Sequence, residues 1–96
     1  MVNTQAALGV SQMDQLEEFI KIKIRNYNLY KELLSDVPGI TLWPFRADTR
    51  ANHWFYSLLI DNKEYGLDRD ELMRRLIAEG IQCRPVWKLC HTQRPY

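Results

Sequence analysis

Hydrophobic side chains recur at three- and four-residue steps through the first third of the chain, at Met13, Leu16, Ile20, Ile24, Tyr27, Tyr30 and Leu34. This spacing is typical of one buried helix face. Asn3 is expected to cap the helix start, and Asp14 with Glu17 can cap a second start if the helix is broken there. Pro38 and Gly39 oppose further helix. The pattern therefore predicts a long N-terminal helix that ends before Pro38.

Three shorter segments have the composition of strands. Residues 40–43 form a short run that Pro44 stops, and residues 81–84 form another near the C-terminus. Residues 53–60, HWFYSLLI, are rich in aromatic and aliphatic side chains and are the strongest strand candidate. Their lack of clean alternation indicates that both faces are covered. Residues 61–63 are expected to form a turn.

Residues 67–80 carry the start and stop signals of a second helix. Asp68 is the expected N-cap, Glu71 closes a capping box, and Gly80 is the expected C′ residue. The expected buried face consists of Leu72, Met73, Leu76 and Ile77. Together the segments predict an α+β fold with a long N-terminal helix, a small, mostly antiparallel three-stranded sheet and a second helix.

Length and charge narrow the classes of function. A chain of 96 residues forms one small domain at most, with a single core. Thirteen basic and twelve acidic residues leave a net charge of +1, so no nucleic-acid partner is expected. No run approaches the roughly 18–20 apolar residues of a membrane span, and the first residues lack the basic region of a signal peptide. We therefore expect a cytoplasmic protein, no membrane partner and free thiols.

Cys83, Cys90 and His91 are the first candidates for chemistry. A metal site needs three or four ligands at matched spacing, whereas these residues read C-x6-C-H with one distant His53. A Cys nucleophile needs a base and an orienting group, and the spacing indicates neither. We therefore expect no metal and no catalytic residue in this chain, and interpret Cys83 as a small apolar residue in a strand.

Residues 84–96, RPVWKLCHTQRPY, combine three basic side chains with aromatic residues, a Cys and a His, which indicates contact with a partner. Trp87 lies between Pro85 and Lys88 and fits either a core or a ligand-stacking role. Trp54, inside the long strand candidate, is interpreted as a core residue. No Gly-rich phosphate loop and no Ser/His/Asp arrangement can be drawn.

Two stretches resemble the DegT/DnrJ/EryC1/StrS family of pyridoxal-phosphate-dependent sugar aminotransferases. Residues 3–20, NTQAALGVSQMDQLEEFI, are similar to the family's QAALG-x-x-QL-like run, and residues 91–96, HTQRPY, resemble its H-x-Q-P-x-Y ending with one extra residue. The resemblance continues through HWFYSLLI and DRDELMRRLIAEGIQCRP and covers the whole chain. Residues 84–96 are similar to the branch that aminates nucleotide-linked 4-keto sugars for bacillosamine- or legionaminate-type products.

The resemblance implies that residues 1–96 are a single C-terminal small domain, as in fold-type I aminotransferases, without the catalytic large domain. In the family, the aldimine lysine and most phosphate-binding groups lie in that large domain. The lysines of this chain match no such position; they are Lys21, Lys23, Lys31, Lys63 and Lys88. Pyridoxal phosphate is therefore expected in the full-length parent and not bound to this chain, which alone is expected to be inactive.

By the same resemblance, the parent would transfer an amino group, usually from glutamate, to a nucleotide-linked keto sugar. Trp87 and His91 are the expected sugar-side contacts, and Arg84 is expected to face a phosphate or carboxylate. Apolar surface left open by the missing domain predicts a homo-oligomer. An alternative stays open: a free-standing, non-catalytic interaction module that binds an aminotransferase or another protein.

Overall fold

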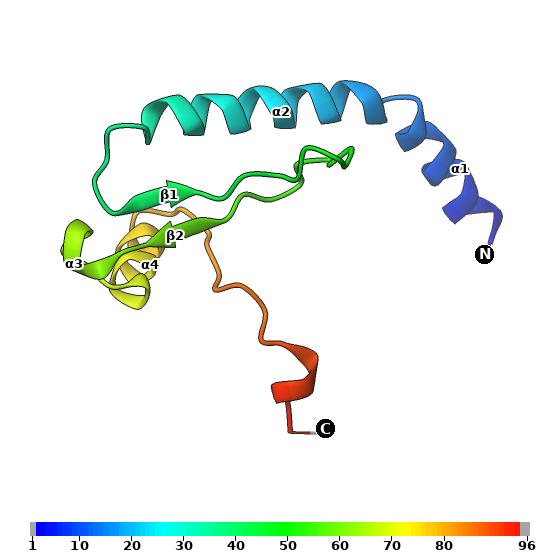
Figure 1. The fold of residues 1–96 in the computed structure, drawn as a ribbon. Helices are drawn as coiled ribbons and strands as arrows, with labels where there is room; N and C mark the ends of the chain where they lie inside the picture. Colours follow the sequence, from blue (N-terminus) through cyan, green and yellow to red (C-terminus); the bar gives the residue numbers. More distant parts are fainter. Residues whose placement is uncertain (1, 95–96) are drawn as a thin grey trace.

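Two helices, α1 (Asn3–Met13) and α2 (Leu16–Leu33), replace the single long helix that the sequence favours. The computed structural model describes residues 2–94, and in it the two helices meet at a bend (Figure 1). The expected caps at Asn3 and Asp14 are wrong, because Val2 is the N-cap of α1 and Gln15 is the N-cap of α2. The Gln5 side chain accepts the Val2 N–H at 3.3 Å, which satisfies that donor one residue before the expected start.

The sheet has two antiparallel strands within residues 2–94, β1 (Ile40–Leu42) and β2 (Leu58–Ile60). Ile40 pairs with Ile60 and Leu42 with Leu58. The α+β class and the first strand are therefore confirmed, while the strand expected over residues 53–60 forms only at its end. The reason lies at its start, where His53 adopts a left-handed backbone with φ of 52° that breaks the extended run.

The third strand expected at residues 81–84 is wrong, because no strand forms in that segment. The Ile81 N–H bonds to the Leu76 carbonyl at 2.9 Å and so completes the end of a helix instead of a sheet ladder. Pro85, which follows the segment, has no N–H to donate to a sheet.

A short helix, α3 (Asn62–Tyr65), takes the place of the turn expected at residues 61–63. Asp61 caps this helix by accepting the Lys63 N–H at 2.9 Å. Gly66 ends it in the left-handed conformation, with φ of 83°.

Helix α4 (Arg69–Ala78) begins and ends where the sequence predicts. The Asp68 carboxylate accepts the Glu71 N–H at 2.8 Å, which confirms the N-cap. The expected capping box also requires the Glu71 side chain to accept the Asp68 N–H, and this part of the prediction is wrong. The Glu71 carboxylate instead accepts the Arg75 Nε–H at 2.7 Å. Gly80, with φ of 79°, is confirmed as the C′ residue.

Aromatic side chains hold α2 against the hairpin. The Tyr56 hydroxyl donates to the Lys23 carbonyl at 2.9 Å, and the Tyr27 hydroxyl donates to the Trp43 carbonyl at 3.3 Å. The rings that meet here are those of Tyr27, Tyr30, Phe45, His53 and Tyr56. Figure 1 shows α2 above the hairpin and α4 below it.

The arrangement of these elements is open. The radius of gyration is 17.5 Å, whereas a compact domain of this length has a value of about 13 Å. The accessible surface is 8851 Å², compared with about 5,800 Å² for a folded monomer of this mass. No side chain among residues 2–94 is fully buried. The face expected on α4 is accordingly only half-buried at Leu72, Met73 and Leu76, and Ile77 is exposed.

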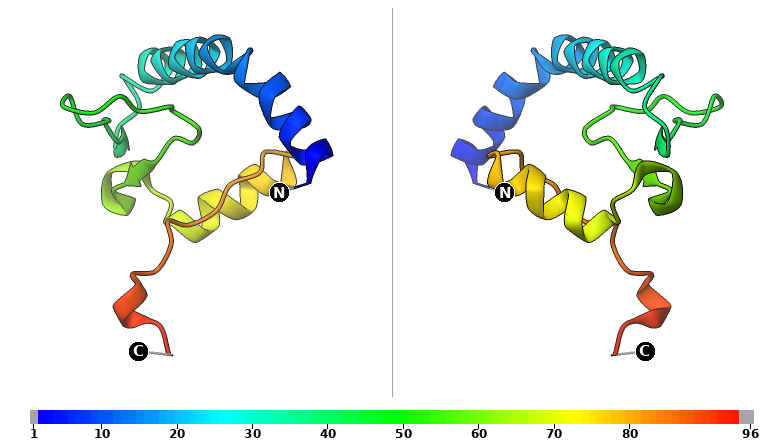
Figure 2. Two further views of the ribbon diagram at one scale, coloured as in Figure 1. Left: turned by 90° about the vertical axis from the view of Figure 1, so that its right-hand side faces the viewer. Right: turned by 90° about the vertical axis from the view of Figure 1, so that its left-hand side faces the viewer.

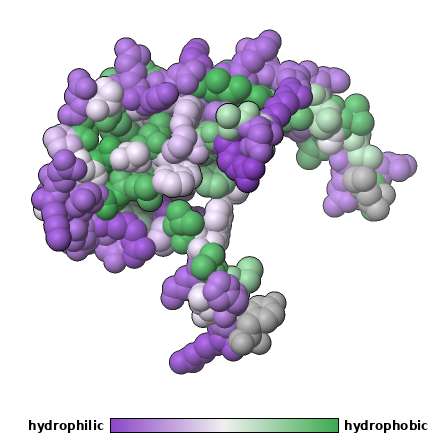
Figure 3. Space-filling view, viewed as in Figure 1, coloured by the Kyte–Doolittle hydropathy of each residue, from purple (hydrophilic) through white to green (hydrophobic). Residues whose placement is uncertain are grey.

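Large hydrophobic side chains are exposed in several parts of the chain. Figure 3 shows hydrophobic patches over α1 and over the part of the molecule formed by α2, the hairpin and α4. On α1, Leu8, Val10 and Met13 each expose 64–66% of their surface. The final segment runs away from the body, as both views in Figure 2 show. No helix within the described part of the chain is long and apolar enough to cross a lipid bilayer.

Candidate functional site

Trp54, Phe55 and Trp87 form an exposed aromatic cluster between the hairpin and the final segment. The rings of Trp54 and Trp87 are nearly parallel, with 22° between their planes and 6.2 Å between their centroids. Phe55 meets both edge-on, at 4.6 Å from Trp54 and 5.6 Å from Trp87. The exposed fractions are 59%, 40% and 68% in chain order, so the core role expected for Trp54 is wrong.

Local backbone geometry turns these rings outward. The Asn52 side-chain oxygen accepts the Trp54 N–H at 3.2 Å, which forms a tight turn around His53. This turn replaces the first part of the expected strand. On the other side of the cluster, Pro85 keeps the backbone before Trp87 out of a helix or ladder. Two irregular segments therefore meet through their aromatic side chains.

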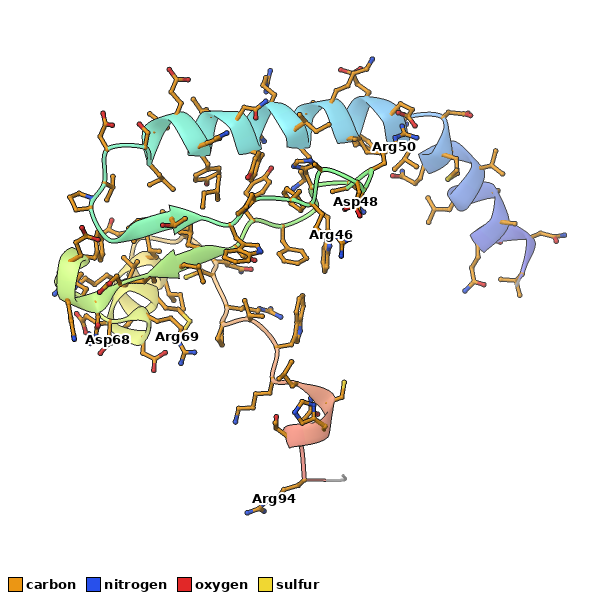
Figure 4. All side chains as sticks on the ribbon, in the orientation of Figure 1. Arg46, Asp48, Arg50, Asp68, Arg69 and Arg94 are labelled. Carbon is orange, nitrogen blue, oxygen red and sulfur yellow. The ribbon has the colours of Figure 1, made fainter. Side chains whose placement is uncertain are left out.

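Of the three residues expected to contact substrate, only Trp87 joins a cluster. Arg84 lies in the irregular segment after α4 and makes no hydrogen bond or ion pair with residues 2–94. His91 lies in the short 3₁₀ helix η1 (Cys90–Thr92), and is exposed. The Thr92 hydroxyl donates to the Leu89 carbonyl at 2.8 Å and holds this turn. Figure 4 shows Arg94, just beyond it, far from the other labelled residues.

A small apolar groove lies between α2 and the loop that precedes β2. Its volume is about 150 Å³, and it is lined by Leu16, Phe19, Ile20, Lys23, Asn52 and Trp54. Arg50 fixes the loop to α2, because its Nη2 lies 2.6 Å from the Glu17 Oε2. Trp54 thus belongs both to this groove and to the aromatic cluster.

The same loop contains a second ion pair, between Arg46 and Asp48. Their closest atoms are 2.6 Å apart, and Figure 4 shows both near the bend in the loop. The hydrogen bond from Arg46 lowers the pKa of Asp48, and the same bond raises the pKa of Arg46. Both side chains are exposed, so the pair organises the loop and contributes little stability.

The imidazole ring of His53 has a nitrogen, Nδ1, that is shielded from solvent. Its Nδ1 has no hydrogen-bond partner within the described part of the chain. The centroid of the His53 ring lies 4.0 Å from that of Phe45 and 5.1 Å from that of Tyr27. No carboxylate among residues 2–94 is paired with it, so these residues do not provide a group that would orient a catalytic base.

The side chains required by a metal or by pyridoxal phosphate do not converge. Among residues 2–94, no three His, Cys, Asp or Glu side chains lie close enough to hold a metal ion. Both cysteines are free thiols, and Cys83 lies 3.7 Å from the Met73 carbonyl.

Pyridoxal phosphate needs a lysine beside a carboxylate and a phosphate cradle. Lys23 lies in a groove otherwise lined by apolar residues and Asn52, and Lys21 pairs with Glu18 on the solvent side of α2. Neither of these two lysines therefore has the surroundings that the cofactor needs.

The family model of the DegT/DnrJ/EryC1/StrS aminotransferase family matches residues 1–96. The chain belongs to this family, which confirms the resemblance. It is 33% identical over 91 residues to a protein of Bacillus subtilis described as putative pyridoxal phosphate-dependent aminotransferase EpsN, covering 95% of this chain and 23% of that protein. It is 30% identical over 97 residues to GDP-perosamine synthase of Caulobacter vibrioides, covering 100% of this chain and 26% of the relative.

A third relative has a different reaction in its name. GDP-4-keto-6-deoxy-D-mannose 3-dehydratase of Yersinia pseudotuberculosis is 35% identical over 80 residues, covering 83% of this chain and 20% of that enzyme. The chain thus spans about a quarter of the length of the curated relatives it matches. No solved structure gives a significant match.

Sequence reasoning missed the contribution of Trp54 and Phe55 to the exposed cluster. The signal is the absence of alternation in HWFYSLLI, on which the expectation of a strand with two covered faces rests. The same absence also fits an irregular segment, and Asn52 before His53 favours a turn at that place.

Proposed function

We propose that this chain is the C-terminal small domain of a pyridoxal-phosphate-dependent enzyme that transfers an amino group, from glutamate, to a nucleotide-linked keto sugar. The match of the whole chain to the aminotransferase family carries this proposal. Two further facts support it: the chain spans about a quarter of its relatives, and its excess surface is about 3,000 Å². One side of a standard protein interface needs only about 800 Å².

In this proposal the small domain forms one wall of the substrate cleft and the rest of the subunit holds the cofactor. Trp87 and His91 contact the sugar, and Arg84 pairs with a phosphate or carboxylate of the substrate. Their exposure supports these roles, because all three side chains are open to a partner. The family's cofactor accepts and passes on the amino group, while the residues of this chain bind and orient the sugar and exclude water.

The proposal is tested in the full-length subunit with a nucleotide-linked 4-keto sugar and glutamate, by measuring the amino sugar formed. Trp87→Ala and His91→Ala should each raise KM about tenfold, because each removes one proposed substrate contact. Lys31→Ala is the matched control, since Lys31 is an exposed residue near the end of α2, and it should leave turnover unchanged. Unchanged KM in both site variants would remove the proposed contacts, and absence of amino sugar would remove the activity.

The Yersinia relative supports a second candidate reaction, the dehydration of a nucleotide-linked keto sugar. The two reactions are separated by the same assay, because amination consumes glutamate and releases an amino sugar. Formation of a deoxy sugar product without an amino group would favour dehydration.

The alternative of a free-standing interaction module is tested by the size of the native product. An antibody against α4 should detect a protein about four times as large as the 11.5 kDa chain in cells that encode it. A single band at 11.5 kDa would favour the module and contradict the enzyme domain.

A further inference from the structure

The cluster of Trp54, Phe55 and Trp87 has the shape of a stacking surface with open ring faces. Two indoles lie almost parallel and the phenyl ring meets both edge-on, so each ring restrains the other two. Yet 40–68% of each side chain stays exposed. Rings that are held in place but left open can bind a planar partner without first being ordered.

The spacing of the indoles decides where such a partner would lie. A ring inserted between two others needs about 7 Å between them, twice the contact distance of about 3.5 Å. Trp54 and Trp87 are 6.2 Å apart at their centroids, so a flat ligand does not fit between them. It would stack on an outer face of the cluster.

Cationic side chains surround Trp87 along the chain. Arg84, Lys88 and Arg94 are exposed, and residues 80–94 contain no Asp or Glu to neutralise them. Lys88 directly follows Trp87. Arg84 and Lys88 are near Trp87 in the sequence, and neither forms an ion pair among residues 2–94. Aromatic rings on the same segment as free cations match a ligand with a planar base and a charged phosphate group.

We propose that Trp54, Phe55 and Trp87 stack on the base of the nucleotide-linked substrate, while Arg84 and Lys88 bind its diphosphate. This inference rests on the proposed function and refines two of its contacts. Trp87 lies against the base rather than the sugar, which leaves His91 on the sugar, and Arg84 binds a phosphate rather than a carboxylate. Stacking recognises the ring of any base, so the cluster supplies affinity for the nucleotide in general.

The test measures binding of UDP, dTDP and GDP to the full-length subunit by calorimetry, with inorganic pyrophosphate as a probe that has charge but no base. Trp87→Ala and Trp54→Ala should each weaken the best-bound nucleotide about tenfold. Neither should change pyrophosphate affinity. Trp87→Phe, which keeps a flat ring, should restore most of the nucleotide affinity.

Trp43→Ala is the matched control. Trp43 directly follows β1 and is 56% exposed, and its ring has no aromatic partner within residues 2–94. This variant should bind all probes as the wild type does. Lys88→Ala should weaken nucleotide and pyrophosphate alike, and should reduce the loss of affinity caused by added salt.

Normal nucleotide affinity in both Trp→Ala variants would overturn the inference. It would do so even if the variants unfold at a lower temperature than the wild type, which would show that the rings pack against other parts of the subunit. If the wild type still aminates the keto sugar in that case, the proposed function stands and only the stacking surface is removed. A wild type that binds none of the three nucleotides overturns both.

Discussion

The carbonyl of Gly39 accepts the Asp61 N–H at 2.8 Å and joins the turn before β1 to the start of α3. The two backbones approach closely at this point. A Cβ added to Gly39 would lie 2.5 Å from the Tyr65 nitrogen and 2.8 Å from the Asp61 oxygen. Gly39 also has a left-handed backbone, with φ of 72°, so only glycine meets both requirements.

Gly39→Ala should therefore destabilise the hairpin by about 2–4 kcal/mol, from backbone strain and steric overlap together. Gly66→Ala separates the two causes, because Gly66 has φ of 83° but no atom within 4 Å of an added Cβ. Gly66→Ala should lower the free energy of unfolding by about 1–2 kcal/mol. Hydrogen exchange of the β1 and β2 amides in the full-length protein measures the difference. Equal effects in the two variants would contradict the close approach.

Asp68→Ala should loosen the first turn of α4, because the Glu71 N–H loses its 2.8 Å acceptor. The expected cost is about 1 kcal/mol, which makes local amide exchange about fivefold faster. Asp68→Ser keeps a capping oxygen and should retain most of the protection. Unchanged exchange at Glu71 in the alanine variant would show that this cap does not limit the opening of the helix.

Tyr56→Phe should have an effect that depends on pH. Burial raises the pKa of Tyr56 above its ordinary value of 10.0, and the neighbouring Tyr30 raises it further. A raised pKa stabilises the fold below pH 10, and this contribution is lost as the pH rises through the folded-state pKa. At pH 7 the variant should lose about 1 kcal/mol, because the bond to the Lys23 carbonyl is removed.

The difference between Tyr56→Phe and wild type should shrink as the pH rises above 10, because only the wild type ionises at this site. Urea unfolding at pH 7 and pH 10.5 measures it. Tyr30→Phe is the control, since the Tyr30 hydroxyl makes no hydrogen bond within residues 2–94, and it should have a small effect at pH 7. A gap for Tyr56→Phe that widens with pH would contradict the raised pKa.

The isolated 96-residue chain should self-associate. It exposes about 3,000 Å² more surface than a compact monomer of its mass, with large apolar side chains along α1. Light scattering should give a mass that rises with concentration. Replacing Leu8 and Met13 by Ser should lower the association, whereas Lys31→Ser, at an exposed polar site, should leave it unchanged. A monodisperse monomer at high concentration in the unmodified chain would contradict this prediction.

Local signals in the sequence predicted the elements that local interactions build. Helix α4 was found because Asp68 and Gly80 satisfy its ends within a few residues of chain. The sequence is compatible with one continuous helix or with a break near Asp14, because the hydrophobic spacing continues across the end of α1 and the start of α2. The N-cap of α1 lies one residue before the expected cap, at Val2, whose own N–H is bound by the Gln5 side chain.

Features that depend on distant residues were not predictable in the same way. The expected third strand at residues 81–84 reflects composition, but a strand needs a partner edge and Ile81 is already bonded to Leu76. The contact between Trp54 and Trp87 joins two irregular segments, for which neither periodicity nor a cap provides a signal. The burial expected for Trp54 and Ile77 also presumed a complete core, which residues 2–94 do not form alone.

We expect the lysine that holds pyridoxal phosphate to lie outside residues 1–96. The most direct measurement reduces the full-length protein with borohydride in the presence of pyridoxal phosphate and locates the modified lysine by peptide mass spectrometry. We predict one stoichiometric site, at a lysine outside this chain. Stoichiometric modification at Lys21, Lys23, Lys31, Lys63 or Lys88 would contradict the account.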